Sequence, residues 1–187
     1  AYDRRNIEKG KLIYSYNSDK TVSNFGRNLS NGEIACATSF CQLYEHCIHN
    51  NIQEVIIMED DIVPLFYDKC VLFDHISSFK QEFPSSKIAL LHNIQMRQLL
   101  NNHEKENIFF TTKNQFSLCK IPPWGNQMFY ITLEAIKQSY QLLIEMNQPA
   151  DNTAQVLAQQ NLVCISNHPL CYHDWNGECS NCLLYTS

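Results

Sequence analysis

The sequence lacks the features that mark several protein classes. It has no run of about 18 apolar residues and no charged-then-apolar leader, so neither a membrane-spanning helix nor a signal peptide is predicted. Its 14 Lys and Arg residues form no long basic block and the net charge is −5, so we expect no nucleic-acid partner. Without repeats or a Pro/Gly/Ser-rich linker, we expect one domain over residues 1–187, located in the cytoplasm.

Cysteine is abundant, but its pattern does not predict a disulfide framework. The count of nine is odd, and most cysteines lie singly within apolar patterns, where a free thiol behaves as a small hydrophobe. The tail is the exception, with Cys171, His173, Cys179 and Cys182, which include one Cys-x-x-Cys. Zinc is an alternative there, although a lone Cys-x-x-Cys with irregular partners is not specific for zinc.

The most informative segment is an apolar run at residues 55–58 that ends in three acids, Glu59, Asp60 and Asp61. The run predicts a strand buried on both faces of a parallel sheet. Ligands of open α/β sheets bind beyond the carboxyl ends of the strands, which is where these acids lie. Their hard oxygens suit Mg²⁺ or Mn²⁺, ions that commonly bridge carboxylates to phosphates. The alternative is a solvated acidic turn after a core strand.

Helical and strand patterns alternate along the chain. Ser30 and Glu33 form a capping box that starts a helix ending near residue 50, and we expect a second helix over residues 68–83, with Phe73 on its apolar face. Apolar runs at 88–91, 128–131 and 162–165 predict further strands, and helices follow residues 132 and 151. This alternation predicts an α/β fold with a mostly parallel, three-layer sheet. Segment 97–120 is polar and predicts a substrate-facing loop or an accessory hairpin.

Two motifs at their spacing resemble glycosyltransferase family 25, which includes bacterial lipopolysaccharide and lipooligosaccharide galactosyltransferases. They are the helix start at residues 29–39 and the Ile-Met-Glu-Asp-Asp-Ile of residues 57–62. Further similarities lie in residues 125–132, which are similar to the family's Gly-x-x-x-aromatic-Tyr-x-Ser/Thr strand, in Pro149-Ala150-Asp151 and in Ala1-Tyr2-Asp3. The resemblance implies two differences: we expect no counterpart of the family's first strand-helix unit in this sequence, and Phe40 stands where relatives usually have histidine.

The resemblance implies a GT-A-like, Rossmann-type fold in which Mn²⁺ or Mg²⁺ bridges carboxylates to the diphosphate of a nucleotide sugar. Asp61 is then the first metal ligand, Asp60 shares metal or ribose contacts, and Glu59 supports them. The remaining nucleotide-sugar contacts implied are Asp3, Trp124 and Tyr130, with His173 completing the metal site. For Tyr130 the alternative is a core aromatic, whereas Pro122, Pro123 and Gly125 predict that Trp124 lies in a loop.

Other polar residues have both a functional and a structural interpretation. Asp151 is the candidate general base of an inverting transfer, and its alternative is an N-cap. His92, after the second buried strand, is a candidate for metal or diphosphate contact, and its alternative is an ordinary polar residue. For Glu33 we expect the capping role, and for Ser39 a packed or backbone-bonded serine.

The resemblance implies a galactosyltransferase that moves galactose from UDP-galactose, with inversion, onto a lipid-linked lipopolysaccharide or lipooligosaccharide core sugar. The lipid-linked acceptor implies peripheral contact with the inner membrane. Two alternatives remain open. One is a non-catalytic remnant that at most binds nucleotide, and the other is an interaction module with a Cys/His tail.

Overall fold

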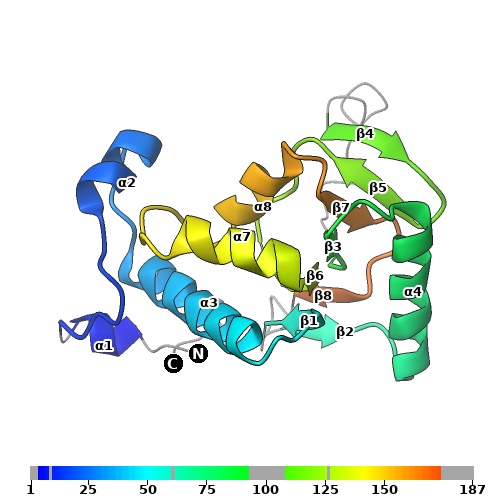
Figure 1. Ribbon diagram of the computed structural model, residues 1–187, viewed down its shortest axis with the longest axis horizontal. Coiled ribbons are helices and arrows are strands. Elements are labelled where there is room, and N and C mark those ends of the chain that lie inside the picture. The colour runs from blue at the N-terminus through cyan, green and yellow to red at the C-terminus, as the bar shows by residue number, and fades with distance from the viewer. Residues whose placement is uncertain (1–3, 9, 60–61, 93–107, 126, 174–187) are drawn as a thin grey trace. The chain divides into compact units, whose positions relative to one another are not determined.

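The computed structural model describes residues 4–8, 10–59, 62–92, 108–125 and 127–173 (Figure 1). The described chain forms two compact units. Among the described residues, the first unit combines those up to Gln53 with Leu133–Thr153, and the second combines Glu54–Thr132 with residues 154–173. The expectation of a single domain stays a prediction.

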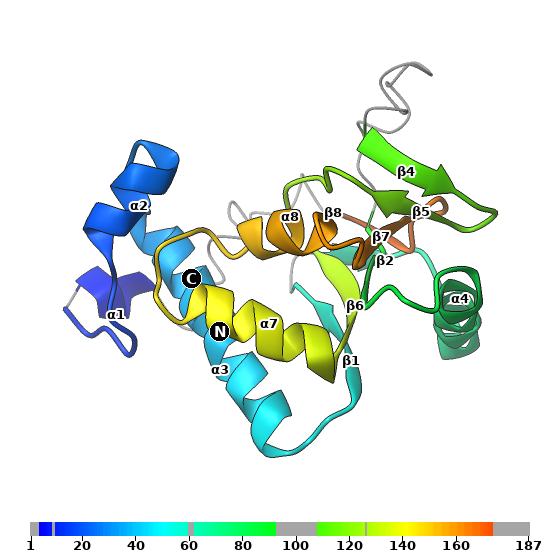
Figure 2. The ribbon, with the colours of Figure 1, turned by 45° about the horizontal axis from the view of Figure 1, so that its top comes forward.

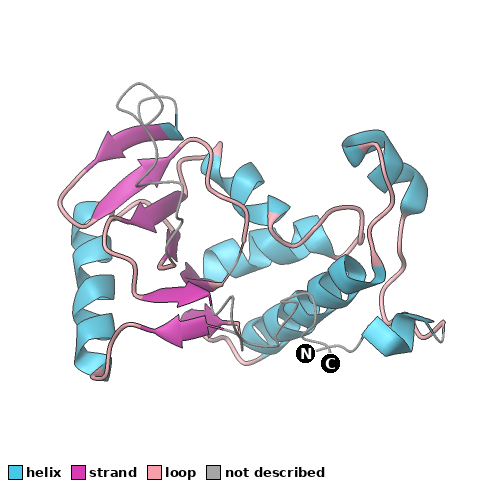
Figure 3. Cartoon of the chain, turned by 180° about the vertical axis from the view of Figure 1, so that it is seen from behind, coloured by secondary structure: helices cyan, strands magenta, loops and turns pink. Residues whose placement is uncertain are grey.

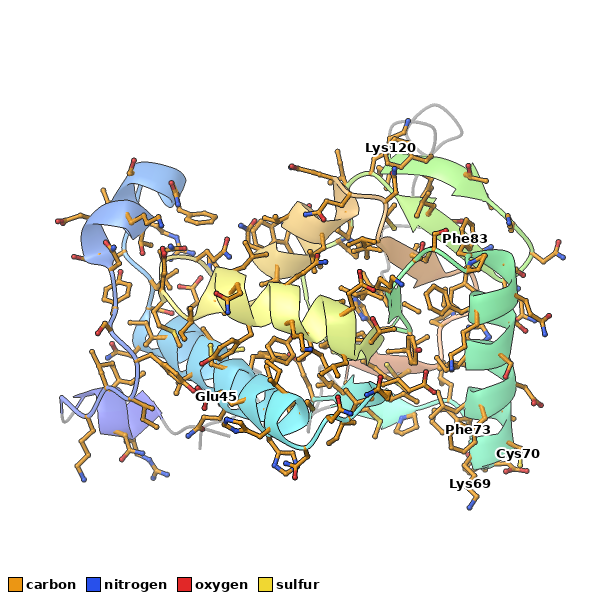
Figure 4. The ribbon with its side chains drawn as sticks, in the orientation of Figure 1. Glu45, Lys69, Cys70, Phe73, Phe83 and Lys120 are labelled. Atoms are coloured by element: carbon orange, nitrogen blue, oxygen red, sulfur yellow. The ribbon has the colours of Figure 1, made fainter. Side chains whose placement is uncertain are left out.

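The first unit is helical. It contains α1 (Arg4–Glu8), α2 (Ser18–Phe25), α3 (Asn31–His49) and α7 (Leu133–Leu143). Helix α3 packs against α7 and α1, and Figures 1 and 2 show α3 and α7 side by side. Tyr140 Oη on α7 donates a hydrogen bond of 2.6 Å to Glu45 Oε1 on α3, which ties the two helices together. Figure 4 labels Glu45 on α3.

The predicted capping box starts α3. Ser30 Oγ accepts from Glu33 N at 3.2 Å, and Glu33 Oε2 accepts from Ser30 N at 2.8 Å. Two donors of the first helical turn are therefore satisfied by side chains three residues apart. Arg27 adds two bonds to the Glu33 carboxylate, at 2.9 and 2.7 Å. This confirms the structural role expected for Glu33.

The second unit contains a six-stranded sheet, which Figure 3 shows in magenta. Its order is β1-β6-β3-β7-β5-β4. The strands are β1 (Glu54–Met58), β3 (Ile88–Leu90), β4 (Phe109–Thr112), β5 (Phe116–Cys119), β6 (Met128–Thr132) and β7 (Val163–Ser166). A separate pair joins β2 (Ile62–Pro64) to β8 (Cys171–His173). The helices of this unit are α4 (Lys69–Glu82) and most of α8 (Asn152–Ala158).

The prediction of a mostly parallel sheet is wrong for the described strands. Only β3 and β7 pair in parallel within the six-stranded sheet, and its other four pairings are antiparallel. Strand β6 enters between β1 and β3 and runs against both. A buried apolar run has the same composition in either direction, so its residues do not reveal how it pairs. The fold is nevertheless a mixed α/β fold, as expected.

Strand β1 also differs from its prediction. We expected burial on both faces, but β1 is an edge strand of the described sheet and only Ile57 is buried. Met58 at its end is 54% exposed. With a neighbour on one side only, an edge strand covers less of its surface than a central one, although its residues are equally apolar.

Helix α4 covers one face of the sheet. Asp68 caps this helix and accepts a hydrogen bond from Cys70 N at 2.8 Å. The buried side chains of α4 pack against the side chains of alternate strand residues. The shared core consists of Leu72, Ile76, Phe79, Phe83, Ala89, Leu91, Phe116, Met128, Tyr130, Cys164, Leu170 and Cys171. Phe73, expected on this face, is exposed near Lys69 and Cys70 at the start of α4 (Figure 4), and Leu72 is buried instead.

The hairpin expected within segment 97–120 is present in its described part. Strands β4 and β5 pair antiparallel, and β5 also pairs with β7, so the hairpin extends the main sheet. Residues 97–107 lie outside the described part of the chain. Whether this segment contacts an acceptor stays a prediction.

The described cysteines have free thiols. Five are buried, namely Cys41, Cys47, Cys119, Cys164 and Cys171, whereas Cys36 is half-buried and Cys70 is exposed. Burial raises the pKa of the Cys41 and Cys164 thiols to about 12. These positions agree with the expectation that most of the cysteines pack as small apolar residues.

Candidate functional site

The carboxyl ends of three strands meet at one edge of the sheet. Because β6 runs against both β1 and β3, these two strands point the same way, and β7 is parallel to β3. Glu59 follows β1 and His92 follows β3 by two residues, so both lie at this edge. The edge predicted to bind ligands therefore forms, although by a different pairing from the one expected.

Glu59, Gln127 and His92 form a row across this edge. The β1–β6 pairing continues beyond the strands, since Glu59 N donates to Gln127 O at 2.8 Å. The β3–β6 pairing continues as well, since Leu91 N donates to Met128 O at 2.9 Å. In that register His92 is the next residue opposite Gln127. Directly opposed residues point to the same face, so the three side chains share a face.

His92 is buried, and one of its ring nitrogens has no partner. Its Nδ1 lies 3.2 Å from Met128 O. A carbonyl oxygen only accepts, so Nδ1 carries the proton and Nε2 presents a lone pair. Nε2 is buried without a hydrogen-bond partner, and the side chain is 2% exposed. Burial lowers the pKa of His92 to about 4, which keeps the imidazole neutral at pH 7.

Gln127 has a second acceptor of this kind. Its Oε1 atom is buried and has no hydrogen-bond partner. Sequence reasoning missed Gln127 as a functional candidate, because it precedes a strand as an ordinary polar residue. Only the antiparallel insertion of β6, which no local pattern reveals, brings it between Glu59 and His92.

The β2–β8 pair brings a further candidate beside the acidic segment. The backbone of His173 pairs with Ile62, the residue that follows Asp61. Cys171 on the same strand forms an isolated bridge with His92. Burial, followed by the Glu59 charge, raises the pKa of the Cys171 thiol to about 12. Strand β8 therefore runs along the same edge as the acidic residues.

Several predicted site residues lie outside the described residues: Asp3, Asp60, Asp61, Cys179 and Cys182. Within the described part, no group of three or more His, Cys, Asp or Glu side chains is arranged to hold a metal ion. Binding of Mn²⁺ or Mg²⁺ at the acids, and of zinc at the tail, therefore stays a prediction. Glu59 is the only member of the acidic triplet among the described residues.

Tyr130 lies in the core under α4. It is 3% exposed, and its ring packs edge-on against Phe79 with 5.6 Å between centroids. Its hydroxyl donates to Glu54 Oε2 at 2.7 Å, at the opposite end of β1 from Glu59. Lys80 donates to the same carboxylate at 2.6 Å, and this hydrogen bond, followed by the one from Tyr130, lowers the pKa of Glu54. The structure supports the core alternative for Tyr130.

Trp124 lies in the loop before β6 and is 61% exposed. Gly125 follows it with φ of 108°, a backbone conformation that glycine adopts without strain. An exposed indole in a loop is available to stack on a ligand, whereas a core aromatic is not. The loop position expected for Trp124 is thus confirmed, and its contact with a ligand stays a prediction.

The motif residues of the first unit have local roles. Ser39 Oγ donates to Ala35 O at 2.9 Å, the backbone-bonded role that we expected. Phe40, at the family's histidine position, is buried and packs against Tyr44 with 5.8 Å between ring centroids. Asp151 is half-buried directly before α8, in a turn closed by Asn152 N donating to Pro149 O at 3.1 Å. A role as base stays a prediction.

The chain matches one known sequence family, described as glycosyltransferase family 25 (LPS biosynthesis protein), over residues 1–154. This match covers most of the chain, so the protein belongs to glycosyltransferase family 25. No curated protein matches the chain. Membership implies glycosyl transfer in lipopolysaccharide biosynthesis, with a sugar-nucleotide donor and a lipopolysaccharide acceptor in general terms.

Proposed function

We propose that this protein is a metal-dependent, GT-A-like hexosyltransferase that moves galactose from UDP-galactose, with inversion, onto a sugar of a lipopolysaccharide or lipooligosaccharide core. The observation that carries the proposal is the shared strand edge. There the acidic segment follows β1, His92 follows β3, and β8 runs alongside. Family membership supports the transfer of a sugar, and this edge supports the site where the donor binds.

The residue types of the acidic segment and of His173 suit a hard divalent cation. Asp60 and Asp61 would supply carboxylate oxygens, and His173 would complete the set from β8, whose backbone pairs with the residue after Asp61. Carboxylates with one imidazole suit Mn²⁺ or Mg²⁺. A bound cation would stabilise the negative charge that develops on the diphosphate as the sugar departs. Glu59 would support the ligands, as an outer carboxylate does in many metal sites.

The remaining donor contacts follow from exposure and family resemblance. Trp124 is exposed and would stack on the base or the sugar. Asp3 is proposed as a nucleotide contact on the resemblance alone. Tyr130 is left out, because its hydroxyl already bonds Glu54 within the core.

Asp151 is proposed as the general base of the inverting step. The acceptor hydroxyl must lose a proton as its oxygen attacks the anomeric carbon, and a carboxylate at a helix start is suited to take it. The half-buried position of Asp151 before α8 supports this role. We therefore expect Asp151→Asn to lower kcat strongly while nucleotide affinity stays close to that of the wild type.

The acceptor is proposed to be lipid-linked, which would bring the protein to the surface of the inner membrane. No helix in the described residues is long and apolar enough to cross a membrane.

The test is a panel of nucleotide sugars incubated with the protein and Mn²⁺, with and without truncated lipooligosaccharide, while nucleotide release is measured. We expect release of UDP from UDP-galactose, accelerated by the acceptor. The second candidate, a non-catalytic remnant, is favoured by one observation: Phe40 is buried against Tyr44, where relatives usually carry histidine. Nucleotide binding without turnover on any donor would identify the remnant, and absence of binding would reject both.

A further inference from the structure

Two buried acceptors without a hydrogen-bond partner belong to residues at opposed positions of the strand edge. They are His92 Nε2 and Gln127 Oε1. Burying an acceptor without a hydrogen bond costs about 1–3 kcal/mol, so native proteins seldom leave one unpaired unless something else binds it. The β3–β6 register, extended by the bond from Leu91 N to Met128 O, places His92 opposite Gln127, so the two side chains share a face. The β-carbons of directly opposed residues lie about 5 Å apart.

The other buried histidine of this unit shows the contrast. His75 on α4 is 7% exposed, and its Nε2 lies 2.7 Å from Ser166 Oγ, so its ring is satisfied within the protein. Its pKa is also lowered, chiefly by burial. Burial alone therefore does not distinguish the two residues. The difference is that His92 keeps a lone pair for which the described residues offer no donor.

A ligand of His92 Nε2 and Gln127 Oε1 must donate hydrogen bonds, because both atoms are acceptors. Phosphate oxygens are themselves acceptors, and the nearby Glu59 carboxylate would repel them. A hard divalent cation prefers several carboxylate oxygens, whereas this row offers one carboxylate, one amide oxygen and one imidazole nitrogen. Hydroxyl groups meet the need, because each donates one hydrogen bond. Two acceptors require two donors, and neighbouring hydroxyls on a sugar ring supply them.

We propose that His92 and Gln127 form a sugar-hydroxyl subsite, in which His92 Nε2 and Gln127 Oε1 accept hydrogen bonds from two neighbouring hydroxyls of the donor. This inference rests on the proposed function and adds residues that recognise the donor. The bond from Nδ1 to Met128 O holds the imidazole in the required tautomer. The hydroxyls belong either to the transferred hexose or to the ribose of the nucleotide, and the two sources are separable by experiment.

The experiment measures binding by calorimetry for the wild type, His92→Phe and Gln127→Met. The ligands are UDP, 2′-deoxy-UDP and UDP-galactose, each with and without Mn²⁺. Phenylalanine keeps a planar aromatic ring at this position and has no acceptor, although its ring is larger than that of histidine. Met128 O keeps its bond from Leu91 N in this variant. His75→Phe is the matched control. It removes the bond to Ser166 and should lower Tm by about 2–4 °C without changing any affinity.

Two outcomes support the subsite. A loss of about 10- to 100-fold for UDP-galactose, with UDP unchanged, assigns the hydroxyls to the hexose. A similar loss of affinity for UDP, with the affinity for 2′-deoxy-UDP unchanged, assigns the hydroxyls to the ribose. Gln127→Met should repeat the pattern of His92→Phe, so a folding defect in one variant leaves the other informative.

Three outcomes overturn it. Unchanged affinities in both variants would mean that the two acceptors bind no part of the donor, while the proposed function would stand. A loss confined to the Mn²⁺-dependent part of binding would make His92 a cation ligand instead. Failure of the wild type to bind any nucleotide would reject the proposed function and the subsite together.

Discussion

Replacement of Tyr130 by Phe tests whether the Tyr130 hydroxyl stabilises the fold or binds the substrate. The hydroxyl donates to Glu54 Oε2 at 2.7 Å, and the ring contacts Phe79 in the core. The change removes the hydroxyl and leaves the ring. Glu54 is half exposed and retains its bonds from Lys80, so the carboxylate is not left unpaired.

The expected cost of Tyr130→Phe is small. A hydrogen bond to a charged group contributes about 1.5–3 kcal/mol, and exposure of Glu54 reduces this to about 1 kcal/mol. For a chain of this length, that loss lowers Tm by about 2–4 °C. Tyr130→Ala also removes the ring and should cost about 3–5 kcal/mol, the usual range for emptying an aromatic core site.

The assay combines thermal unfolding with calorimetric titration of UDP in Mn²⁺. We expect Tyr130→Phe to bind UDP as tightly as the wild type, because its hydroxyl serves the core. Glu54→Gln should cause a similar small loss of stability, and the double variant should lose less than the sum of the two. A tenfold loss of UDP affinity in Tyr130→Phe, with Tm unchanged, would refute the core assignment.

Three further predictions concern local features. Ser30→Ala removes an N-cap acceptor from α3 and should lower the free energy of unfolding by about 1 kcal/mol, measured by urea denaturation; no change would mean that the box does not stabilise the helix. The pKa of His92 falls from 6.5 to about 4 on folding, so its contribution to stability is complete above pH 6.5 and is lost as the pH falls towards 4. His92→Phe should therefore show a weaker pH dependence of Tm in that window, and identical curves would contradict the burial. Cys70, which is exposed, should react with iodoacetamide faster than Cys41 or Cys164 in peptide mapping; equal rates would contradict their burial.

Local sequence rules predicted α3, α4, α7 and α8, whereas α1 and α2 were not predicted. The start of α3 depends on Ser30 and Glu33, three residues apart, and that of α4 on Asp68 directly before the helix. Such contacts form within one turn, so the sequence contains all the information needed. The helical role of Ser39, which bonds the backbone one turn earlier, follows for the same reason.

The pairing of the strands was not predictable from local rules. Whether β6 runs with or against β1 depends on residues far apart in the chain, and the apolar composition of both strands is the same in either case. The choice between Leu72 and Phe73 on α4 has a similar origin. The two are neighbours on the helix, about 100° apart, and only the position of the sheet decides which is buried.

The candidate site was predicted only in part, because some of its residues come together through the strand pairing. Glu59 could be found at the end of an apolar run that stops in acids. His92 could be found because it directly follows the apolar run at residues 88–91. Gln127 could not, because its place between them depends on the antiparallel insertion of β6. Family resemblance supplied the general activity, and the structure supplied the neighbours of each residue.

The central claim is that the acids at the end of β1 hold a divalent cation and, through it, the diphosphate of the donor. Calorimetric titration of UDP with and without Mn²⁺ tests it on the wild type, Asp61→Ala and Asp74→Ala. Asp74 is an exposed acid on α4 and serves as the control. We predict that Asp61→Ala abolishes the Mn²⁺-dependent binding and that Asp74→Ala binds as the wild type does. Unchanged UDP affinity in Asp61→Ala would contradict the claim.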